Sequence, residues 1–557
     1  MLQRSALIVI TIVLLFAGCG HTDDQPYDIL ITGGLVVDGT GAPGISADVA
    51  ITADSIVAVG QLSGARAATV IDATGLTVSP GFIDIHSHSD YALLTDGNAE
   101  SKIRQGVTTE ILGESASAGP RRAAERNDGS NGTTPDWETL GGYFDRLLAS
   151  GISVNIGSYV GSMQIRRYVM GNEYRAATPE EIKQMQALAV AAMQDGALGI
   201  ASALLGSPLT TEELIAMCSA VAPYKGIYAT HIRDEGGKIF ESLDEAFRIG
   251  REAGVPVDVL HLKIAERKLW GRMNDVLARF EQARANGLRV TANMYPYIAG
   301  QNNLVSLIPP WAQDGGRKAM LNRLRDPKIR IKLRQALYGS VPVPGWYNHY
   351  TSSAGWESML LVNTRAERNK NLIGLRMNEV IALRSGKEPS DVLYDLLLEE
   401  NGSVPTIYFL MTEEDVRTAM QSPLVSFGSD GTAVKPEGVL GRGKPHPRWY
   451  GTFPRVLGKY VREEGVISLE TAIHKMTWMN AEKIGLRNRG IIRKGMAADI
   501  CIFDAGRIID RATFTDPHQY SEGVEYVLVN GKVVLEHGRH TGLRPGQVLR
   551  GSGYSRE

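Results

Sequence analysis

The stretch Pro80-Gly81-Phe82-Ile83-Asp84-Ile85-His86-Ser87-His88 decides the fold of this chain. It is an apolar run that ends in two histidines separated by one residue. On a β-strand, residues i and i+2 point to the same face, so the imidazoles of His86 and His88 can reach one metal ion. The sequence therefore predicts a buried strand whose carboxyl end carries part of a metal site.

Seven further apolar runs follow this stretch, and segments with helical character separate them. Pro179–Gln194 is the clearest helix, because it has a proline near its start and acidic residues in its first turn. Strands that alternate with helices indicate βα units and a parallel sheet, and eight such units predict a TIM-type (β/α)8 barrel. The eight runs are Gly81–His88, Val107–Gly113, Val154–Val160, Ala197–Ala203, Ile227–Asp234, Val257–Lys263, Arg289–Tyr297 and Leu424–Asp430.

The two ends of the chain are rich in β patterns. Short strand-like runs punctuated by glycine fill residues 27–79 and 488–545, and neither piece can form a full core alone. We therefore expect them to meet in one small β-sandwich domain, with the barrel in residues 80–487. Within the barrel, residues 301–405 interrupt the spacing of the runs and have helical character. They predict a lid-like insertion after strand seven, on the side where barrel enzymes carry their active sites.

The N-terminus has the pattern of an export signal. Residues 1–18 contain the apolar run Ala6–Phe16, which is too short to span a membrane. The small residues before Cys19 resemble a bacterial lipobox, in which Cys19 becomes the lipidated first residue; the alternative is a plain cleaved signal. Residues 19–26 are then a polar tether. We expect an exported protein of the bacterial cell envelope, periplasmic or surface-facing, that meets the membrane only through a lipid anchor at Cys19.

The composition is that of an ordinary globular protein. Of the 557 residues, 43% are hydrophobic and 22% charged, and the formal net charge is −2. These values exclude a disordered chain and a disulfide scaffold. They also argue against a nucleic-acid partner bound through a basic surface. Cys218 and Cys501 lie in apolar patterns and are expected to be buried rather than paired.

Four more candidate ligands lie at the carboxyl ends of predicted strands. His231 and His261 end successive runs; each alone is more typical of a buried core histidine, but together they favour metal ligands. Asp430 ends the eighth run, where the alternative is a turn-capping aspartate. Glu114 follows the second run, where a carboxylate could bridge two metals held by neutral imidazoles. The alternative for Glu114 is a surface carboxylate.

These motifs resemble the amidohydrolase superfamily and, within it, the N-acyl-D-amino-acid deacylases, or D-aminoacylases. The resemblance covers almost the whole mature chain. Pro80–His88 marks the superfamily, whereas His231–Glu235 and Gly451–Leu457 are closer to the deacylase branch. The other matching stretches are Tyr27–Gly34, Gly106–Thr109, His261–Lys263, Tyr295–Tyr297, Gly428–Gly431 and Gly495–Asp499.

The resemblance implies a cofactor and a set of residue roles. The cofactor is Zn²⁺, with one or two ions per chain. The implied roles are one metal at His86 and His88, a second at His231 and His261, a general base at Asp430, and substrate contacts at Lys263 and Tyr295. One position departs from the family, which typically has Gly-Asn-Cys-Gly after strand two with the cysteine as a ligand. Here Gly113-Glu114-Ser115-Ala116 stands there. Ser115 takes the cysteine position and is a poor zinc ligand, so we expect Glu114 to be the bridge.

The reaction implied is hydrolysis of the amide of an N-acyl-D-amino acid, or of a short peptide. A cyclic-amide hydrolase of the hydantoinase or dihydroorotase type and an unusual dipeptidase are the enzymatic alternatives. The former is disfavoured because Ala197–Ala203 lacks the lysine that such enzymes carry on strand four. A surface-tethered binding lipoprotein on an inactive barrel is the alternative from another class. After the eighth run, four cationic or imidazole side chains either help to hold an anion or form a solvated loop: Arg442, Lys444, His446 and Arg448.

Overall fold

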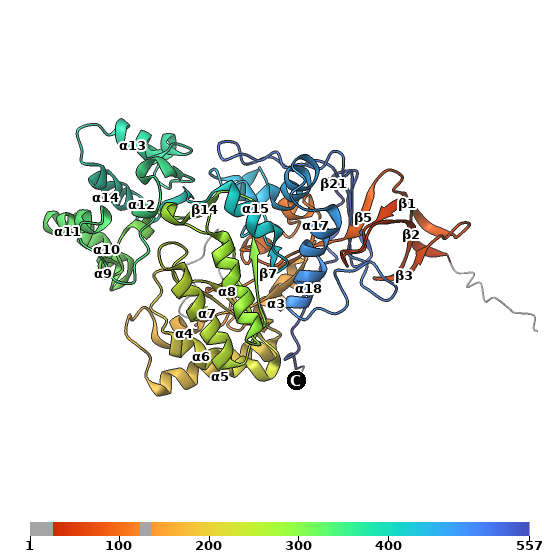
Figure 1. Cartoon of the computed structure of the whole chain (residues 1–557), viewed down its shortest axis with the longest axis horizontal. Helices are drawn as coiled ribbons and strands as arrows, with labels where there is room; N and C mark the ends of the chain where they lie inside the picture. The colour runs from red at the N-terminus through yellow and green to blue at the C-terminus, as the bar shows by residue number, and fades with distance from the viewer. Residues whose placement is uncertain (1–25, 123–134, 556–557) are drawn as a thin grey trace, which may run out of the picture.

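The computed structural model describes residues 26–122 and 135–555. The signal segment 1–18 and Cys19 lie outside the described residues. Three parts follow one another along the molecule in Figure 1: a β-rich domain at one end, a central barrel, and a helical insertion at the other end. The predicted fold class, a (β/α)8 barrel with a β domain and an insertion after strand seven, is confirmed.

Parallel strands form the barrel wall. β6 pairs with β7 and β7 with β8, and a second series runs from β9 through β10, β11, β12 and β13 to β17. Tyr159 alone separates β8 from β9, so both belong to the third strand of the barrel. The ring closes where strand eight meets strand one, because the backbone N–H of Asp430 donates to the carbonyl of His86 at 2.8 Å. The wall strands are β6 (Phe82–Asp84), β7 (Val107–Leu112), β8 (Asn155–Ser158), β9 (Val160–Gly161), β10 (Gly199–Ala203), β11 (Ile227–His231), β12 (Val257–Val259), β13 (Val290–Met294) and β17 (Val425–Phe427).

Helices follow these strands and cover the outside of the barrel. The predicted helix of residues 179–194 is α5 (Pro179–Asp195), which begins with a capping box between Thr178 and Glu181 and ends at Gly196 in a left-handed conformation. The other helices of the barrel are α1 (Ala92–Thr95), α2 (Glu100–Ile103), α3 (Leu140–Ser150), α4 (Ser162–Met170), α6 (Thr211–Val221), α7 (Ile239–Ala253), α8 (Met273–Ala285), α15 (Glu413–Gln421), α16 (Arg448–Arg455), α17 (Leu469–Met476) and α18 (Trp478–Lys483). A π-helical segment, Val456–Glu463, continues α16.

The two ends of the chain share one nine-stranded sheet. β5, near the end of the N-terminal piece, pairs antiparallel with β18 of the C-terminal piece. Apolar side chains of both pieces, including Ile31, Val49, Ile500 and Leu528, are fully buried in one common core. The strands are β1 (Tyr27–Val36), β2 (Ile45–Thr52), β3 (Ser55–Gly60), β4 (Ala67–Asp72), β5 (Thr77–Pro80), β18 (Ile500–Phe503), β19 (Val524–Val529), β20 (Lys532–Glu536) and β21 (Arg539–His540).

The insertion after β13 has a core of its own. Buried leucines and tyrosines, such as Leu324, Tyr394 and Tyr408, hold its helices together. A three-stranded antiparallel sheet, in the order β14-β16-β15, joins it to the barrel. Its elements are β14 (Ala299–Asn303), α9 (Pro310–Gln313), α10 (Gly316–Arg325), α11 (Pro327–Leu337), α12 (His349–Ser352), β15 (Met359–Leu361), α13 (Met377–Leu383), α14 (Pro389–Glu399) and β16 (Pro405–Phe409).

The last residues of the chain return to the barrel. The backbone N–H of Gly546 donates to the carbonyl of Ile152 at 2.8 Å, and that of Leu549 donates to Ile156 at 2.7 Å. Ile152 and Ile156 lie at the start of the third barrel strand. The C-terminal segment therefore covers the floor of the barrel, opposite the edge that carries His86 and Asp430.

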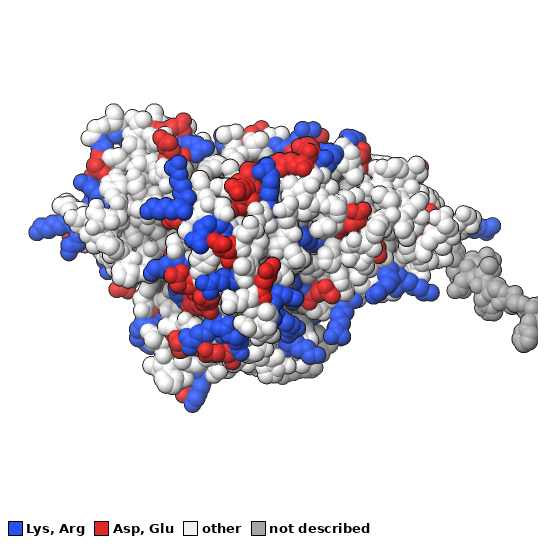
Figure 2. Space-filling view, in the orientation of Figure 1, with Lys and Arg blue, Asp and Glu red and all other residues white. Residues whose placement is uncertain are grey.

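The surface carries charges of both signs. On the face shown in Figure 2, basic and acidic side chains are interspersed over the barrel and the insertion. Within residues 26–122 and 135–555, no helix combines the length and apolar character needed to cross a membrane. Cys218 and Cys501 are buried and unpaired, as expected.

Candidate metal centre

The predicted ligands follow the carboxyl ends of five barrel strands. His86 and His88 follow β6, Glu114 follows β7, and His231 is the last residue of β11. His261 and Asp430 follow β12 and β17 and adopt positive φ angles of 38° and 49°. Non-glycine residues rarely adopt such angles, which cluster at functional sites.

Glu114 lies at the centre of the cluster. One carboxylate oxygen, Oε2, is 2.7 Å from Nε2 of His86 and 3.0 Å from Nε2 of His88. The other oxygen, Oε1, is 3.8 Å from Nδ1 of His231. The two oxygens of one carboxylate thus face both predicted histidine pairs. The hypothesis that Glu114 bridges two metals requires this placement.

An acidic residue, Glu235, contacts the second histidine pair, His231 and His261. The rings of His231 and His261 are 4.5 Å apart and nearly perpendicular. Oε1 of Glu235 lies 3.0 Å from Nδ1 of His261, an arrangement that orients a metal-ligating imidazole. Burial and the positive charge of Lys263 lower the pKa of His261 to about 4. The imidazole is therefore neutral at pH 7, which is the form that binds a metal.

Asp430 lies between the histidines and an arginine. Its Oδ1 is 3.0 Å from Nε2 of His88, and its Oδ2 is 2.8 Å from Nη1 of Arg448. Burial opposes ionisation, but the positive charge of Arg448 and then that of His86 hold the pKa of Asp430 well below its usual value. Asp430 is thus a carboxylate at neutral pH, able to accept a proton.

The donor atoms fit zinc. Two groups of ligand atoms, each lying within 4.8 Å of one another, share Glu114: one with His86, His88 and Asp430, the other with His231 and His261. Imidazole nitrogens and carboxylate oxygens are the ligands of catalytic zinc sites, and the two overlapping groups suit one or two ions. Ser115, the alternative to Glu114, has a φ of 56°, and its carbonyl accepts a hydrogen bond from the backbone of Gln164.

Three further side chains surround the site on the substrate side. The predicted contacts Lys263 and Tyr295 are both buried. Nζ of Lys263 lies 2.5 Å from Glu235 and 2.7 Å from Nδ1 of His261. The guanidinium of Arg448 stacks over the ring of Tyr295 at 4.5 Å. Two cations and a phenol hydroxyl therefore lie next to the candidate ligands, where an anionic substrate group could bind.

The loop after strand eight is only partly solvated. Arg442 is exposed and Lys444 half-buried, whereas His446 and Arg448 are buried. His446 accepts a hydrogen bond at Nδ1 from the backbone N–H of Arg448 and faces the carbonyl of Ala299 at 2.9 Å. The loop thus contributes Arg448 to the site. The sequence had left open whether this loop helps to hold an anion or is solvated.

Sequence analysis named Glu235 only as part of a family motif and gave it no role. Its position four residues after His231 was the feature of the sequence that could have indicated a role beside the histidines.

A buried ion cluster that sequence analysis missed lies beneath the ligands. Nζ of Lys102 is 2.6 Å from Oδ2 of Asp84 and 3.4 Å from Oε2 of Glu110, and all three side chains are fully buried. The negative charges of Asp84 and Glu110 outweigh the effect of burial and raise the pKa of Lys102. Lys102 also donates to Oγ of Ser429 at 2.8 Å, and Glu110 accepts a hydrogen bond from Ser87. The cluster therefore ties the residue between the two histidines of strand one to the residue before Asp430.

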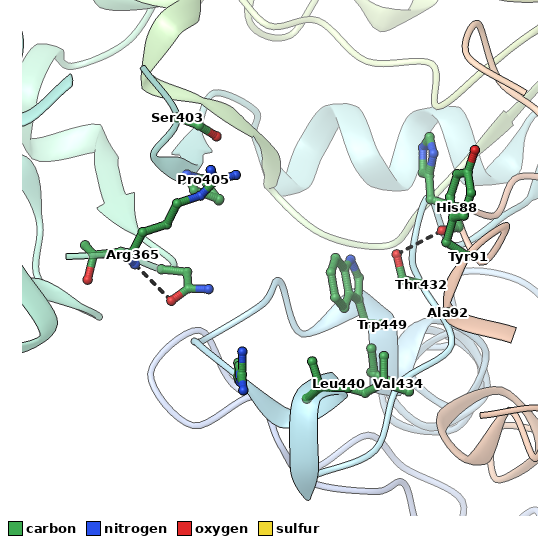
Figure 3. Close-up of a pocket in the computed structure, with 14 residues that line it drawn as sticks. His88, Tyr91, Ala92, Arg365, Ser403, Pro405, Thr432, Val434, Leu440 and Trp449 are labelled. Carbon is green, nitrogen blue, oxygen red and sulfur yellow. Dashed lines mark hydrogen bonds between the residues drawn. The ribbon is translucent and has the colours of Figure 1, made fainter. Parts of the chain in front are cut away.

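A cavity of about 720 Å³ opens from the centre toward the insertion. In Figure 3, His88 and Tyr91 lie on the barrel side of this cavity, Arg365 and Pro405 on the insertion side, and the ring of Trp449 between them. A substrate held at the ligands would extend into this space.

Known proteins resemble this chain over nearly its whole length. The sequence model of the Amidohydrolase family matches residues 69–333 and 396–535 of this chain. A D-aminoacylase from Alcaligenes xylosoxydans xylosoxydans is 36% identical over 539 residues, which cover 95% of this chain and 99% of the relative. This chain belongs to the amidohydrolase family, in its N-acyl-D-amino-acid deacylase branch. An N-acyl-D-aspartate deacylase from the same organism is 32% identical, and the match covers 95% of this chain and 96% of the relative.

Solved structures of the family share its architecture. A D-aminoacylase with a binuclear metal centre superposes with a TM-score of 0.79 at 36% identity. The N-acyl-D-glutamate deacylase from Bordetella bronchiseptica, complexed with zinc and a phosphonate inhibitor, gives a TM-score of 0.78 at 29% identity. Each match covers 94% of this chain and 100% of the other. The L-hydantoinase from Arthrobacter aurescens, at 17% identity and a TM-score of 0.54, shares the fold alone.

Proposed function

We propose that this amidohydrolase is a zinc-dependent deacylase that cleaves the amide of N-acyl-D-amino acids to a carboxylate and a free D-amino acid. The observation that carries the proposal is the position of Glu114, whose carboxylate faces both histidine pairs beside Asp430. The named activities of the relatives that match the full chain support the same reaction.

The residues of the site would have distinct roles in the reaction. Zinc bound by the histidines and Glu114 would polarise the amide carbonyl and acidify water at neutral pH. Asp430, held as a carboxylate by Arg448, would accept the proton of the attacking water and pass it to the leaving amine. Lys263, Tyr295 and Arg448 would bind the α-carboxylate through charge-assisted hydrogen bonds. For Lys263 this requires the carboxylate to share or replace its contact with Glu235.

A substrate screen tests the proposal. The zinc-loaded protein is assayed for amine release from N-acetyl-D-methionine, N-acetyl-L-methionine and a D-Ala-D-Ala dipeptide. A 5-substituted hydantoin is assayed for ring opening to the N-carbamoyl amino acid, because this reaction releases no free amine. We expect the D-acyl substrate to be preferred by kcat/KM, and Asp430→Asn to abolish the signal as a control against contaminating hydrolases. Ring opening of the hydantoin without deacylation would favour the cyclic-amide hydrolase. No hydrolysis of any substrate by a zinc-replete protein would favour a binding protein.

We further propose that the enzyme works in the bacterial cell envelope, anchored by a lipid at Cys19. The support is the sequence alone: an apolar segment Ala6–Phe16 followed by small residues and a cysteine. The first described strand, β1, starts shortly afterwards at Tyr27. The residues between Cys19 and Tyr27 would leave the folded domains close to the membrane surface.

A further inference from the structure

The cavity that opens from the candidate metal centre is positively charged. Among the described residues that line it, Arg365 and Arg442 carry formal charge and no aspartate or glutamate is present. Within residues 26–122 and 135–555, neither guanidinium makes an ion pair or a hydrogen bond. Two free cations in a concave site attract an anion, because low-dielectric walls concentrate their field.

The backbone that carries Arg365 is fixed in place. The buried carboxylate of Glu400 accepts hydrogen bonds from the backbone N–H groups of Arg365 and Ala366 and from the side chain of Asn369. The carboxylate of Glu400, at the end of helix α14, is therefore occupied by these groups and does not pair with the guanidinium of Arg365. The backbone position of Arg365 is therefore set in advance, while its side chain is exposed and its charge stays available to a ligand.

The two arginines come from different parts of the chain that are joined by the backbone. Arg365 belongs to the insertion, and Arg442 to the loop after strand eight. The backbone N–H of Lys444 donates to the carbonyl of Val362 at 2.8 Å, which fixes the two loops side by side. A side chain at Gly443 would collide with Val362, so the close approach depends on this glycine. Arg365 of the insertion and Arg442 of the barrel thus lie on adjoining loops that line the same cavity.

We propose that Arg365 and Arg442 form a second anion subsite, which selects substrates carrying an acidic group remote from the scissile amide. The inference rests on the proposed deacylase function. Lys263, Tyr295 and Arg448 already lie at the candidate metals for the α-carboxylate, so the cavity arginines would bind a further carboxylate. That carboxylate can belong to the amino-acid side chain or to a dicarboxylic acyl group, and both present the same chemistry to a guanidinium.

Matched pairs of substrates distinguish the two sources. Initial rates give kcat/KM for N-acetyl-D-glutamate against N-acetyl-D-glutamine, and for N-succinyl-D-methionine against its ω-amide. Each pair differs in one charge at nearly constant shape. We expect the acid to be preferred about tenfold in at least one pair, and the pair that shows it identifies the part of the substrate that reaches the arginines.

Two variants then test the residues. In the double variant Arg365→Met, Arg442→Met the ratio of acid to amide should fall to about one or below. Arg368→Met, an exposed arginine of the same insertion that does not line the cavity, is the matched control and should keep the wild-type ratio. A wild-type ratio near one in both pairs would overturn the proposal, as would a ratio that the double variant leaves unchanged.

A binding measurement separates this proposal from the deacylase function. If the zinc-loaded protein hydrolyses none of these compounds, the deacylase function is wrong, and calorimetric titration with the same acid and amide pairs decides the subsite. Tighter binding of an acid that is lost in the double variant supports the subsite. Equal binding of acid and amide, or no binding of either, rejects it.

Discussion

Lys102→Met should destabilise the barrel by about 3–5 kcal/mol. The ammonium is fully buried and lies 2.6 Å from Asp84 and 3.4 Å from Glu110, which are also fully buried. Methionine keeps most of the side-chain volume but leaves the two carboxylates without their shared cation. Removing one partner from a buried ion pair typically costs this amount, because the remaining charge is neither solvated nor compensated.

Urea denaturation followed by tryptophan fluorescence measures the loss. Lys435→Met is the matched control, because Nζ of Lys435 lies equally close, 2.6 Å, to Asp96 but its side chain is 37% exposed. Exposed pairs of this kind contribute at most about 1 kcal/mol. Equal losses in the two variants would refute the argument that burial, rather than distance, sets the magnitude.

The same change should also lower kcat. Lys102 donates hydrogen bonds to Ser429 and Ser87, the neighbours of Asp430 and of the two histidines of strand one. Without these bonds, the ends of strands one and eight are held less firmly, and misplacement of a general base slows the reaction. In Lys102→Met, kcat should therefore fall at temperatures where circular dichroism shows the protein to be folded. An unchanged kcat would restrict Lys102 to a stabilising role.

The remaining predictions concern the ligands and the N-terminus. Glu114→Gln should reduce the zinc content measured by elemental analysis and lower kcat/KM strongly, whereas Ser115→Ala should be nearly silent; the reverse order would reject the bridge. Asp430→Asn should retain zinc while kcat falls by ~10²–10⁴, and activity within a few-fold of wild type would assign the base elsewhere. His231→Ala should lose zinc and activity together, and full zinc content would contradict its role. Cys19→Ala should move the protein from the membrane to the soluble fraction, and continued membrane retention would contradict lipidation.

The sequence predicted the parts of the site that depend on local pattern. His86, His88 and Asp430 each end an apolar run, and in a parallel barrel the carboxyl ends of all strands meet at one edge. Their proximity therefore followed once the strands were recognised. Glu114 was predicted in the same way, from its place after the second run, and the structure places it between the two histidine pairs.

The parts that were missed depend on tertiary packing. Lys102 lies on the short helix α2, where a lysine is normally solvent-exposed, and its burial becomes evident only when strands one and eight close around it. Arg448 was a candidate anion-binding residue in the sequence, but its ion pair with Asp430 was not predicted, because this contact depends on the turn before helix α16 that His446 stabilises. The small sheet β14-β16-β15 was absent from the predicted insertion because its strands pair across a long stretch of helices.

The nine-stranded sheet, which needs both ends of the chain, has a consequence for the timing of folding. β5 can pair with β18 only after the C-terminal piece of the chain has been synthesised. The same holds for the C-terminal segment that covers the floor of the barrel. Contacts of such long sequence separation form slowly, because the loop between them must close first. During synthesis the N-terminal strands therefore remain without a finished core. If the protein is exported as we propose, this late completion of the fold would keep the chain unfolded while it crosses a membrane.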